Sequence, residues 1–101
     1  MMRYPELAPN TKYYRLQEYI RTFKNKAEFE IEISYIEKKL GIILNNTCFR
    51  APSAFWGNGG WQKNVQKKAW LSQGFEVYPT PIVHEGRREG VVKFRKLSRH
   101  H

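Results

Sequence analysis

The side chains best suited to bind a ligand lie between residues 45 and 74. This stretch holds all three tryptophans of the chain, several lysines and amides, and no Asp or Glu. Lysine and arginine neutralise phosphate groups, Asn and Gln form paired hydrogen bonds with base edges, and an exposed tryptophan stacks on an unpaired base. The composition of this stretch therefore predicts a surface that binds a polyanion, with nucleic acid as the first candidate.

Ten residues form the predicted nucleic-acid interface. Lys63 and Lys67 would contact phosphates, and the neighbouring amides would contact base edges, although ordinary solvated helix surface is the alternative interpretation for each amide. Basic residues before this segment and at the tip of a later hairpin, residues 86–90, would bracket it and fix its register on duplex DNA. The predicted binding residues are Arg50, Asn58, Trp61, Gln62, Lys63, Asn64, Gln66, Lys67, Arg87 and Arg88.

The three tryptophans are not equivalent. Trp56 and Trp70 have apolar neighbours and are expected in the core, and Asn58 would hold the loop after Trp56 through hydrogen bonds from its side chain to the backbone. Trp61 follows two glycines and is the best candidate for exposure. An exposed Trp61 would make single-stranded DNA or RNA an alternative to duplex DNA, because stacking needs an unpaired base.

The charge balance of the whole chain indicates the same class of ligand. The formal net charge is +9, and the sequence pI is about 9.9. Residues 1–45 hold eight basic and six acidic residues, whereas residues 46–101 hold ten basic and three acidic residues. This asymmetry places most of the positive charge in the C-terminal half, as expected of a nucleic-acid binder. The alternative is that the lysines only keep a small protein in solution.

Catalytic, metal-binding and cofactor-binding residues are not expected. The sequence has no phosphate-binding glycine motif, no Ser, His and Asp arrangement that the spacing supports, and no acidic cluster suited to Mg²⁺. The single cysteine, Cys48, has no companion for a disulfide or a zinc site. A metal-free ribonuclease that uses His84 with a basic residue is a minor alternative.

The apolar pattern predicts the elements that position these residues. Helices are expected at residues 13–23, 35–40, 47–49 and 61–73, with a helical turn near 52–56. Strands are expected at residues 27–34 and 75–78 and in a hairpin formed by 82–83 and 91–95. The glutamates of the first strand alternate with apolar residues and would therefore face solvent.

Caps define the expected ends of two helices. Ser34 and Glu37 have the spacing of a capping box at the start of helix 35–40, and Gly41 would end that helix. Gly74 would end the basic helix 61–73.

This order of elements predicts one α+β domain. The expected fold is a small winged helix-turn-helix-like domain with three or four helices, a short strand and a C-terminal β-hairpin, in which helix 61–73 reads DNA and the hairpin is the wing. Residues 1–12 would form an N-terminal arm, residues 13–97 the domain, and residues 98–101 a tail whose histidine pair is typical of an expression tag. Without an apolar span or a signal sequence, we expect a cytoplasmic protein that binds no membrane.

Several motifs occur together in a known pattern. The chain contains YYRLQEYI, EFEIEIS, YIEKKLG, FWGN, AWLSQG and VVKFR in this order between Tyr13 and Arg95. It thereby resembles a small uncharacterised bacterial and phage domain family with a YxxLxxYL helix, an IExxLG helix, paired aromatics before Asn, an AWLxxG helix and a VxFxR strand. The resemblance implies an accessory module, sometimes attached to nuclease or restriction-type proteins, that associates with DNA and has no defined catalytic residues. The sequence departs from the pattern at Gly59–Trp61 and in its longer hairpin.

A protein-binding role is the main alternative function. A small phage or bacterial interaction protein could inhibit a host nucleic-acid enzyme by covering its surface, and a basic chain would suit an acidic protein face. The two functions differ in salt dependence, because release of counterions from several phosphates makes nucleic-acid affinity fall steeply as salt rises.

Overall fold

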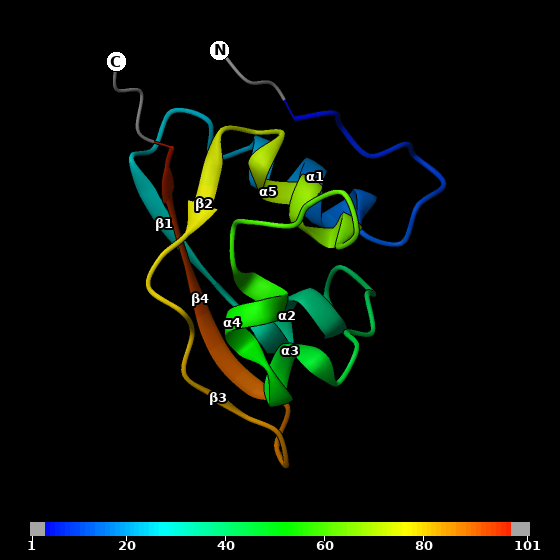
Figure 1. Cartoon of the computed structure of the whole chain (residues 1–101), viewed down its shortest axis with the longest axis vertical. Helices are drawn as coiled ribbons and strands as arrows, with labels where there is room; N and C mark the ends of the chain where they lie inside the picture. The colour runs from blue at the N-terminus through cyan, green and yellow to red at the C-terminus, as the bar shows by residue number, and fades with distance from the viewer. Residues whose placement is uncertain (1–3, 98–101) are drawn as a thin grey trace.

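An antiparallel sheet with helices on one face organises residues 4–97, the part of the chain that the computed structural model describes (Figure 1). The strands are β1 (Glu28–Glu32), β2 (Phe75–Val77), β3 (Val83–His84) and β4 (Glu89–Lys96). The helices are α1 (Tyr14–Arg21), α2 (Ile33–Lys38), α3 (Thr47–Arg50), α4 (Pro52–Trp56) and α5 (Lys68–Leu71), with a 3-10 helix, η1 (Val65–Lys67), before α5.

The predicted α+β class and the C-terminal hairpin are confirmed, although the described part contains five α-helices instead of three or four. The expected tail at residues 98–101 lies outside the described residues, as do residues 1–3 of the expected arm. Within residues 4–97 no helix is long and apolar enough to cross a bilayer.

β4 is the central strand because it is long enough to pair with three others. β1 and β2 pair antiparallel with β4 on its two sides, and β3 pairs with its first residues. Phe94 of β4 lies opposite both Phe29 of β1 and Val77 of β2. In β1 the exposed glutamates alternate with buried Phe29 and Ile31, which confirms the predicted half-buried strand.

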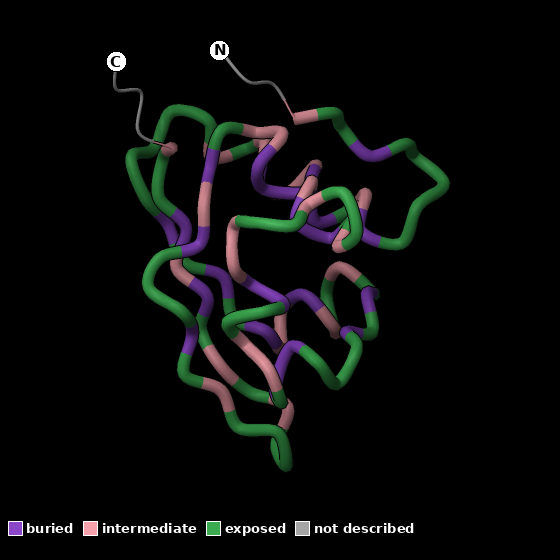
Figure 2. Tube along the Cα trace, viewed as in Figure 1, coloured by how far each residue is buried: buried purple, intermediate pink, exposed green. Residues whose placement is uncertain are grey.

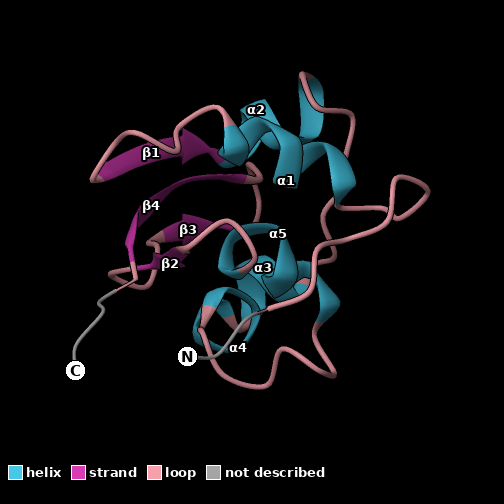
Figure 3. Ribbon diagram, turned by 90° about the horizontal axis from the view of Figure 1, so that it is seen from above, coloured by secondary structure: helices cyan, strands magenta, loops and turns pink. Residues whose placement is uncertain are grey.

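The helices cover one face of the sheet and leave the other face open (Figure 3). On the covered face, the Trp70 ring centroid lies 5.9 Å from that of Phe94 and 5.5 Å from that of Trp56. Trp56 and Trp70 are both fully buried, so their predicted place in the core is confirmed. Figure 2 shows buried stretches where strands and helices meet and an exposed β3–β4 turn.

The predicted capping box of the second helix is wrong. α2 begins at Ile33, one residue after β1 ends, so Ser34 lies inside its first turn and no side chain caps the helix. Glu37 instead accepts hydrogen bonds from the Leu44 backbone and from Arg88 of the β3–β4 turn. α2 ends at Lys38, two residues before the predicted end, and Gly41 lies three residues beyond it with a φ of 71°, a conformation that glycine adopts without strain.

The predicted continuous helix 61–73 is also wrong. Residues 61–63 form a turn, and η1 and α5 follow as two short helices. The break occurs at Asn64, whose φ of −113° and ψ of 80° are not helical. Its side-chain amide donates to the Gly60 carbonyl over 3.1 Å, a local hydrogen bond of the kind that competes with helix formation.

The winged helix-turn-helix arrangement is therefore not confirmed, because the segment assigned to DNA reading has no continuous helix. One smaller prediction for this region holds, because the hairpin turn falls at residues 85–88 between β3 and β4. α5 ends at Leu71, and Gly74 follows three residues later with a φ of 85°.

Candidate nucleic-acid interface

Residues 57–64 form a loop between α4 and η1 that leads to the start of α5 at Lys68, and Asn58 anchors this loop to the sheet. The Asn58 amide nitrogen donates to the Val77 carbonyl over 3.3 Å, and the Val77 backbone N–H donates to the Asn58 side-chain oxygen over 3.2 Å. The predicted role of Asn58 in holding the loop is thus confirmed. Its amide is engaged on both sides, so Asn58 serves the fold rather than a base edge.

Two of the predicted binding residues lie inside the protein. Gln66 is 8% exposed and Lys67 is 4% exposed. Gln66 donates to the Phe55 carbonyl over 3.2 Å, and the Lys67 ammonium donates to the Gly59 carbonyl. Burial lowers the pKa of Lys67. The helical phase that placed both residues on a polar face is wrong, because the chain does not form one helix here.

The remaining residues of the loop form a small basic surface around Trp61. We define the Trp61 patch as Trp61, Gln62, Lys63 and Lys68. Gln62 and Lys63 are exposed, and the Lys68 ammonium lies 5.5 Å from the Trp61 ring centroid. Trp61 itself is half-buried and packs edge-to-face with Tyr4, at a centroid distance of 5.7 Å. The predicted exposure of Trp61 is therefore partial.

Lys68 was not among the predicted binding residues, although it adjoins Lys67 in the sequence. The adjacent residues Lys67 and Lys68 indicate two positive charges in the sequence, but the sequence does not indicate which of the two side chains faces solvent. In the structure the first lysine turns inward to the Gly59 carbonyl and the second lies over Trp61.

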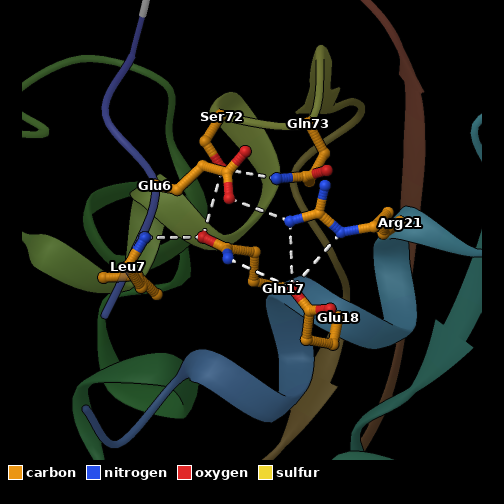
Figure 4. Close-up of polar contacts among 7 residues, drawn as sticks. All are labelled: Glu6, Leu7, Gln17, Glu18, Arg21, Ser72 and Gln73. Atoms are coloured by element: carbon orange, nitrogen blue, oxygen red, sulfur yellow. Dashed lines mark hydrogen bonds and ion pairs between the residues drawn. The ribbon is translucent and has the colours of Figure 1, made fainter. Parts of the chain in front are cut away.

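The N-terminal arm places Tyr4 against this patch, and Figure 4 shows how Glu6 and Leu7 of the same arm lie beside α1. Gln17 of α1 is fully buried, and its side-chain oxygen accepts hydrogen bonds from the Leu7 backbone over 2.7 Å and from the Ser72 hydroxyl over 3.3 Å. Glu6, the residue before Leu7, forms an ion pair with Arg21 at 2.9 Å. These contacts fix residues 6 and 7 against α1 and thereby hold the chain that leads back to Tyr4.

The predicted hairpin residue Arg88 is a structural tie. Its guanidinium donates to Glu37 over 2.6 Å, to the Leu44 carbonyl over 2.7 Å and to Asn46 over 2.8 Å. Burial alone would raise the pKa of Glu37, but the hydrogen bonds from Arg88 and the Leu44 backbone outweigh it and hold that pKa below its usual value. Arg88 therefore joins the β3–β4 turn to α2 and is occupied within the fold.

The other two predicted arginines also have acidic partners. Arg50 forms an ion pair with Glu85 at 2.5 Å, and Arg87 forms one with Glu89 at 3.6 Å. Arg50, Arg87 and Arg88 gather near the β3–β4 turn at one end of the molecule, whereas the loop before α5 lies further up beside α1 and α5 (Figure 1). The predicted bracketing of one helix by these arginines is thus replaced by two separate regions.

A second basic group is formed by residues that the sequence analysis did not single out. Lys12 and Arg15 lie at the start of α1, and Lys38 and Lys39 lie at the end of α2. The Arg15 guanidinium donates to the Leu40 carbonyl over 3.3 Å, which brings the two helix ends together. A shallow depression of about 470 Å³ lies beside them, lined in part by Lys12 and Arg15. Spacing along the sequence could not reveal this group, because only folding unites its two halves.

Ion pairing determines which cations are available to a ligand. Within residues 4–97, carboxylates lie within ion-pair distance of Arg21, Arg50, Arg87, Arg88, Lys93 and Arg95. No such partner is found in this part of the chain for Lys63, Lys68 or the four residues of the second basic group. The positive charge available to a ligand is thus carried chiefly by lysines.

The groups that could have supported catalysis are dispersed. Burial raises the pKa of the Cys48 thiol to about 12, so it stays protonated at neutral pH. His84 is exposed in β3. In the part of the chain that the structure describes, no three His, Cys, Asp or Glu side chains come close enough together to hold a metal ion.

Comparisons of the chain with protein-family models, with curated proteins and with solved structures found no match. The function must therefore be inferred from the geometry and charge of the residues themselves.

Proposed function

We propose that this protein is a non-catalytic nucleic-acid-binding protein that contacts the phosphate backbone through Lys63 and Lys68 beside Trp61. The observation that carries the proposal is the charge of the Trp61 patch. Its two lysines have no carboxylate partner within residues 4–97, and no acidic residue occurs between residues 45 and 74. A cationic surface next to a partly exposed aromatic ring suits a phosphate backbone with an adjacent base.

Duplex DNA is the first ligand to test, but the proposed contact differs from that of a recognition helix. Insertion into the major groove uses a continuous helix or a two-stranded ribbon, and residues 61–73 form neither. The lysines of the loop would instead contact phosphates from outside the groove. Such binding positions the protein on nucleic acid without reading its sequence, so weak sequence preference is expected.

The second basic group would strengthen the attraction. Lys12, Arg15, Lys38 and Lys39 add four positive charges on another part of the helical layer. Charges of one sign raise the rate of encounter with a polyanion even where they make no direct contact. This group would therefore contribute to overall affinity, whereas the Trp61 patch would determine whether a base stacks.

Fluorescence anisotropy tests the proposal with labelled duplex DNA, single-stranded DNA and RNA, each titrated with the protein at two salt concentrations. With the two phosphate contacts of Lys63 and Lys68, affinity should fall about tenfold between about 50 and 200 mM salt. Preference for a single strand would assign the contact to stacking on Trp61. Absence of binding to all three ligands at the lower salt concentration would refute the proposed function.

A further inference from the structure

We infer that the open face of the sheet is a docking site for an extended segment of a partner protein that carries basic residues at alternate positions together with aliphatic ones. This face lies opposite the helical layer and the Trp61 patch (Figure 3). A groove of about 690 Å³ runs over it, between the outward side chains of β1 and β4 and the segment 79–82 that leads into β3.

Two glutamates in the groove stand out from the charge pattern of the chain. Seven of the nine glutamates have a basic partner within residues 4–97, and the exceptions in that range are Glu30 and Glu32. Both belong to β1, both are exposed, and both line the groove. In a chain of net charge +9 this face thus holds the carboxylates that remain available to a cation.

The register of the sheet explains why these two glutamates are left without partners. Lys93 lies opposite Glu30, and Arg95 lies opposite Glu28. Arg95 turns away from Glu28 and forms an ion pair with Glu76 of β2 at 2.7 Å. Lys93 then reaches diagonally to Glu28, at 3.1 Å. Glu30 therefore loses its cross-strand cation.

Glu32 has no cation to lose, because it lies opposite Val91. The Glu32 carboxylate accepts a 3.4 Å hydrogen bond from the Ser34 hydroxyl. A basic side chain from another molecule would satisfy both carboxylates.

The segment before β3 and the start of β4 add an apolar wall to the groove, whose lining also includes the ion-paired Lys93 and Glu89 and the exposed His84. Ile82 is 85% exposed and Val91 is 45% exposed, and both line the groove together with Pro79 and Pro81. Large apolar side chains exposed side by side are typical of interaction surfaces. The apolar wall explains why the expected partner carries aliphatic side chains as well as positive charge.

The spacing of the carboxylates defines the partner further. Glu30 and Glu32 lie on the same side of one strand, so their backbone positions are about 6.7 Å apart. An extended segment presents every second side chain on one side with the same repeat. Two basic residues separated by one residue would therefore match the two carboxylates, and the alternate residues would face the apolar wall. A nucleic acid would be repelled by this face, so the site is separate from the proposed nucleic-acid interface.

The test uses a short fluorescein-labelled peptide in which arginine alternates with valine, and a control peptide of the same composition with its arginines grouped at one end. Both are titrated against the ¹⁵N-labelled full chain at physiological salt. We expect the alternating peptide to bind more tightly and to shift the amide resonances of β1, β4 and residues 79–82. Absence of binding, equal binding of the two peptides, or shifts confined to the helical layer would overturn the inference.

Matched variants separate the groove from net charge. Glu30→Gln with Glu32→Gln should weaken binding of the alternating peptide about tenfold, because two exposed ion pairs are removed. The control is Glu6→Gln with Glu85→Gln, which changes the net charge equally outside the groove and should leave the affinity within about twofold of wild type. If the control pair weakens binding as much as the groove pair, the affinity for the peptide depends on the overall charge of the protein and not on the groove. That result would overturn the inference. The dispersion of the amide spectrum verifies that each variant is folded.

Discussion

At the scale of single residues, basic side chains serve two purposes in this chain. Arg88 and Lys63 both occur in basic, polar stretches, and both were predicted to contact nucleic acid. In the structure Arg88 donates to Glu37, Leu44 and Asn46, whereas Lys63 is exposed without an acidic partner within residues 4–97. The difference lies in which carboxylate folding brings near, and local sequence does not contain that information.

The Arg88–Glu37 pair should stabilise the protein in a pH-dependent manner. The pKa of Glu37 is lower in the folded state than the ordinary value of 4.5 for a Glu carboxyl, so its stabilising contribution is present above that ordinary value. The contribution should disappear as the pH falls through the lower folded-state pKa. Glu37→Gln should reduce the free energy of unfolding by about 2 kcal/mol at neutral pH and flatten its decrease in acid, as measured by urea unfolding at a series of pH values. An unchanged pH profile in the variant would contradict this assignment.

The lysines of the Trp61 patch should control nucleic-acid affinity. Lys63→Ala with Lys68→Ala should weaken binding to every nucleic-acid sequence about tenfold or more and reduce the slope of log affinity against log salt by about two, because two phosphate contacts are lost. Anisotropy titrations at several salt concentrations measure both quantities. Lys24→Ala with Lys26→Ala, in the turn after α1, is the control with the same change of charge. Equal effects of the two pairs would show that binding follows net charge and not this patch.

At the scale of elements, apolar periodicity predicted those parts of the fold where one face is buried over several residues. α1 buries Leu16 and Ile20, and β1 buries every second residue, so both patterns are visible in the sequence. The prediction of one helix over residues 61–73 was wrong, because the apparent helical spacing runs across a turn and two short helices. The turn is stabilised by Asn64. The burial of Lys67 could not be predicted for the same reason, since its acceptor is a backbone carbonyl of the loop.

The loop after α4 depends on the absence of a side chain at Gly57. A β-carbon at this position would lie 2.4 Å from the Ser53 carbonyl oxygen, a contact that the backbone could relieve only by moving. Gly57→Ala should therefore lower the free energy of unfolding by about 1–3 kcal/mol. At Gly59, two residues later, a β-carbon would meet no atom within 4 Å. Gly59→Ala should change the stability by less than about 0.5 kcal/mol, and urea unfolding of both variants checks the contrast.

At the scale of the whole molecule, ion pairs redistribute the charge that the sequence displays. Lys93 and Arg88 of the C-terminal half pair with Glu28 and Glu37 of the N-terminal half. The excess of basic residues after residue 46 is therefore partly neutralised by glutamates that come before it. Within residues 4–97, the lysines without an ion-pair partner lie in both halves, and the two glutamates without one share one face of the sheet.

The N-terminal arm should be part of the folding unit. Leu7 is buried, and its backbone N–H satisfies the side-chain oxygen of the fully buried Gln17. A fragment that begins at residue 13 lacks this hydrogen bond and the apolar contact of Leu7. It should be less stable than the full chain by about 3 kcal/mol or more in urea unfolding. Coincident unfolding curves for the fragment and the full chain would show that the arm contributes nothing to stability.

The hydrogen bonds between Asn58 and Val77 also block one pairing position on an open edge of the sheet. β2 lies at an edge of the sheet, and an edge strand offers backbone groups with which a strand of another molecule can pair. The Asn58 amide occupies the N–H and the carbonyl of Val77 as a neighbouring peptide group would. A single side chain thereby takes the place of a further strand and leaves an incoming chain no pairing partner at that residue.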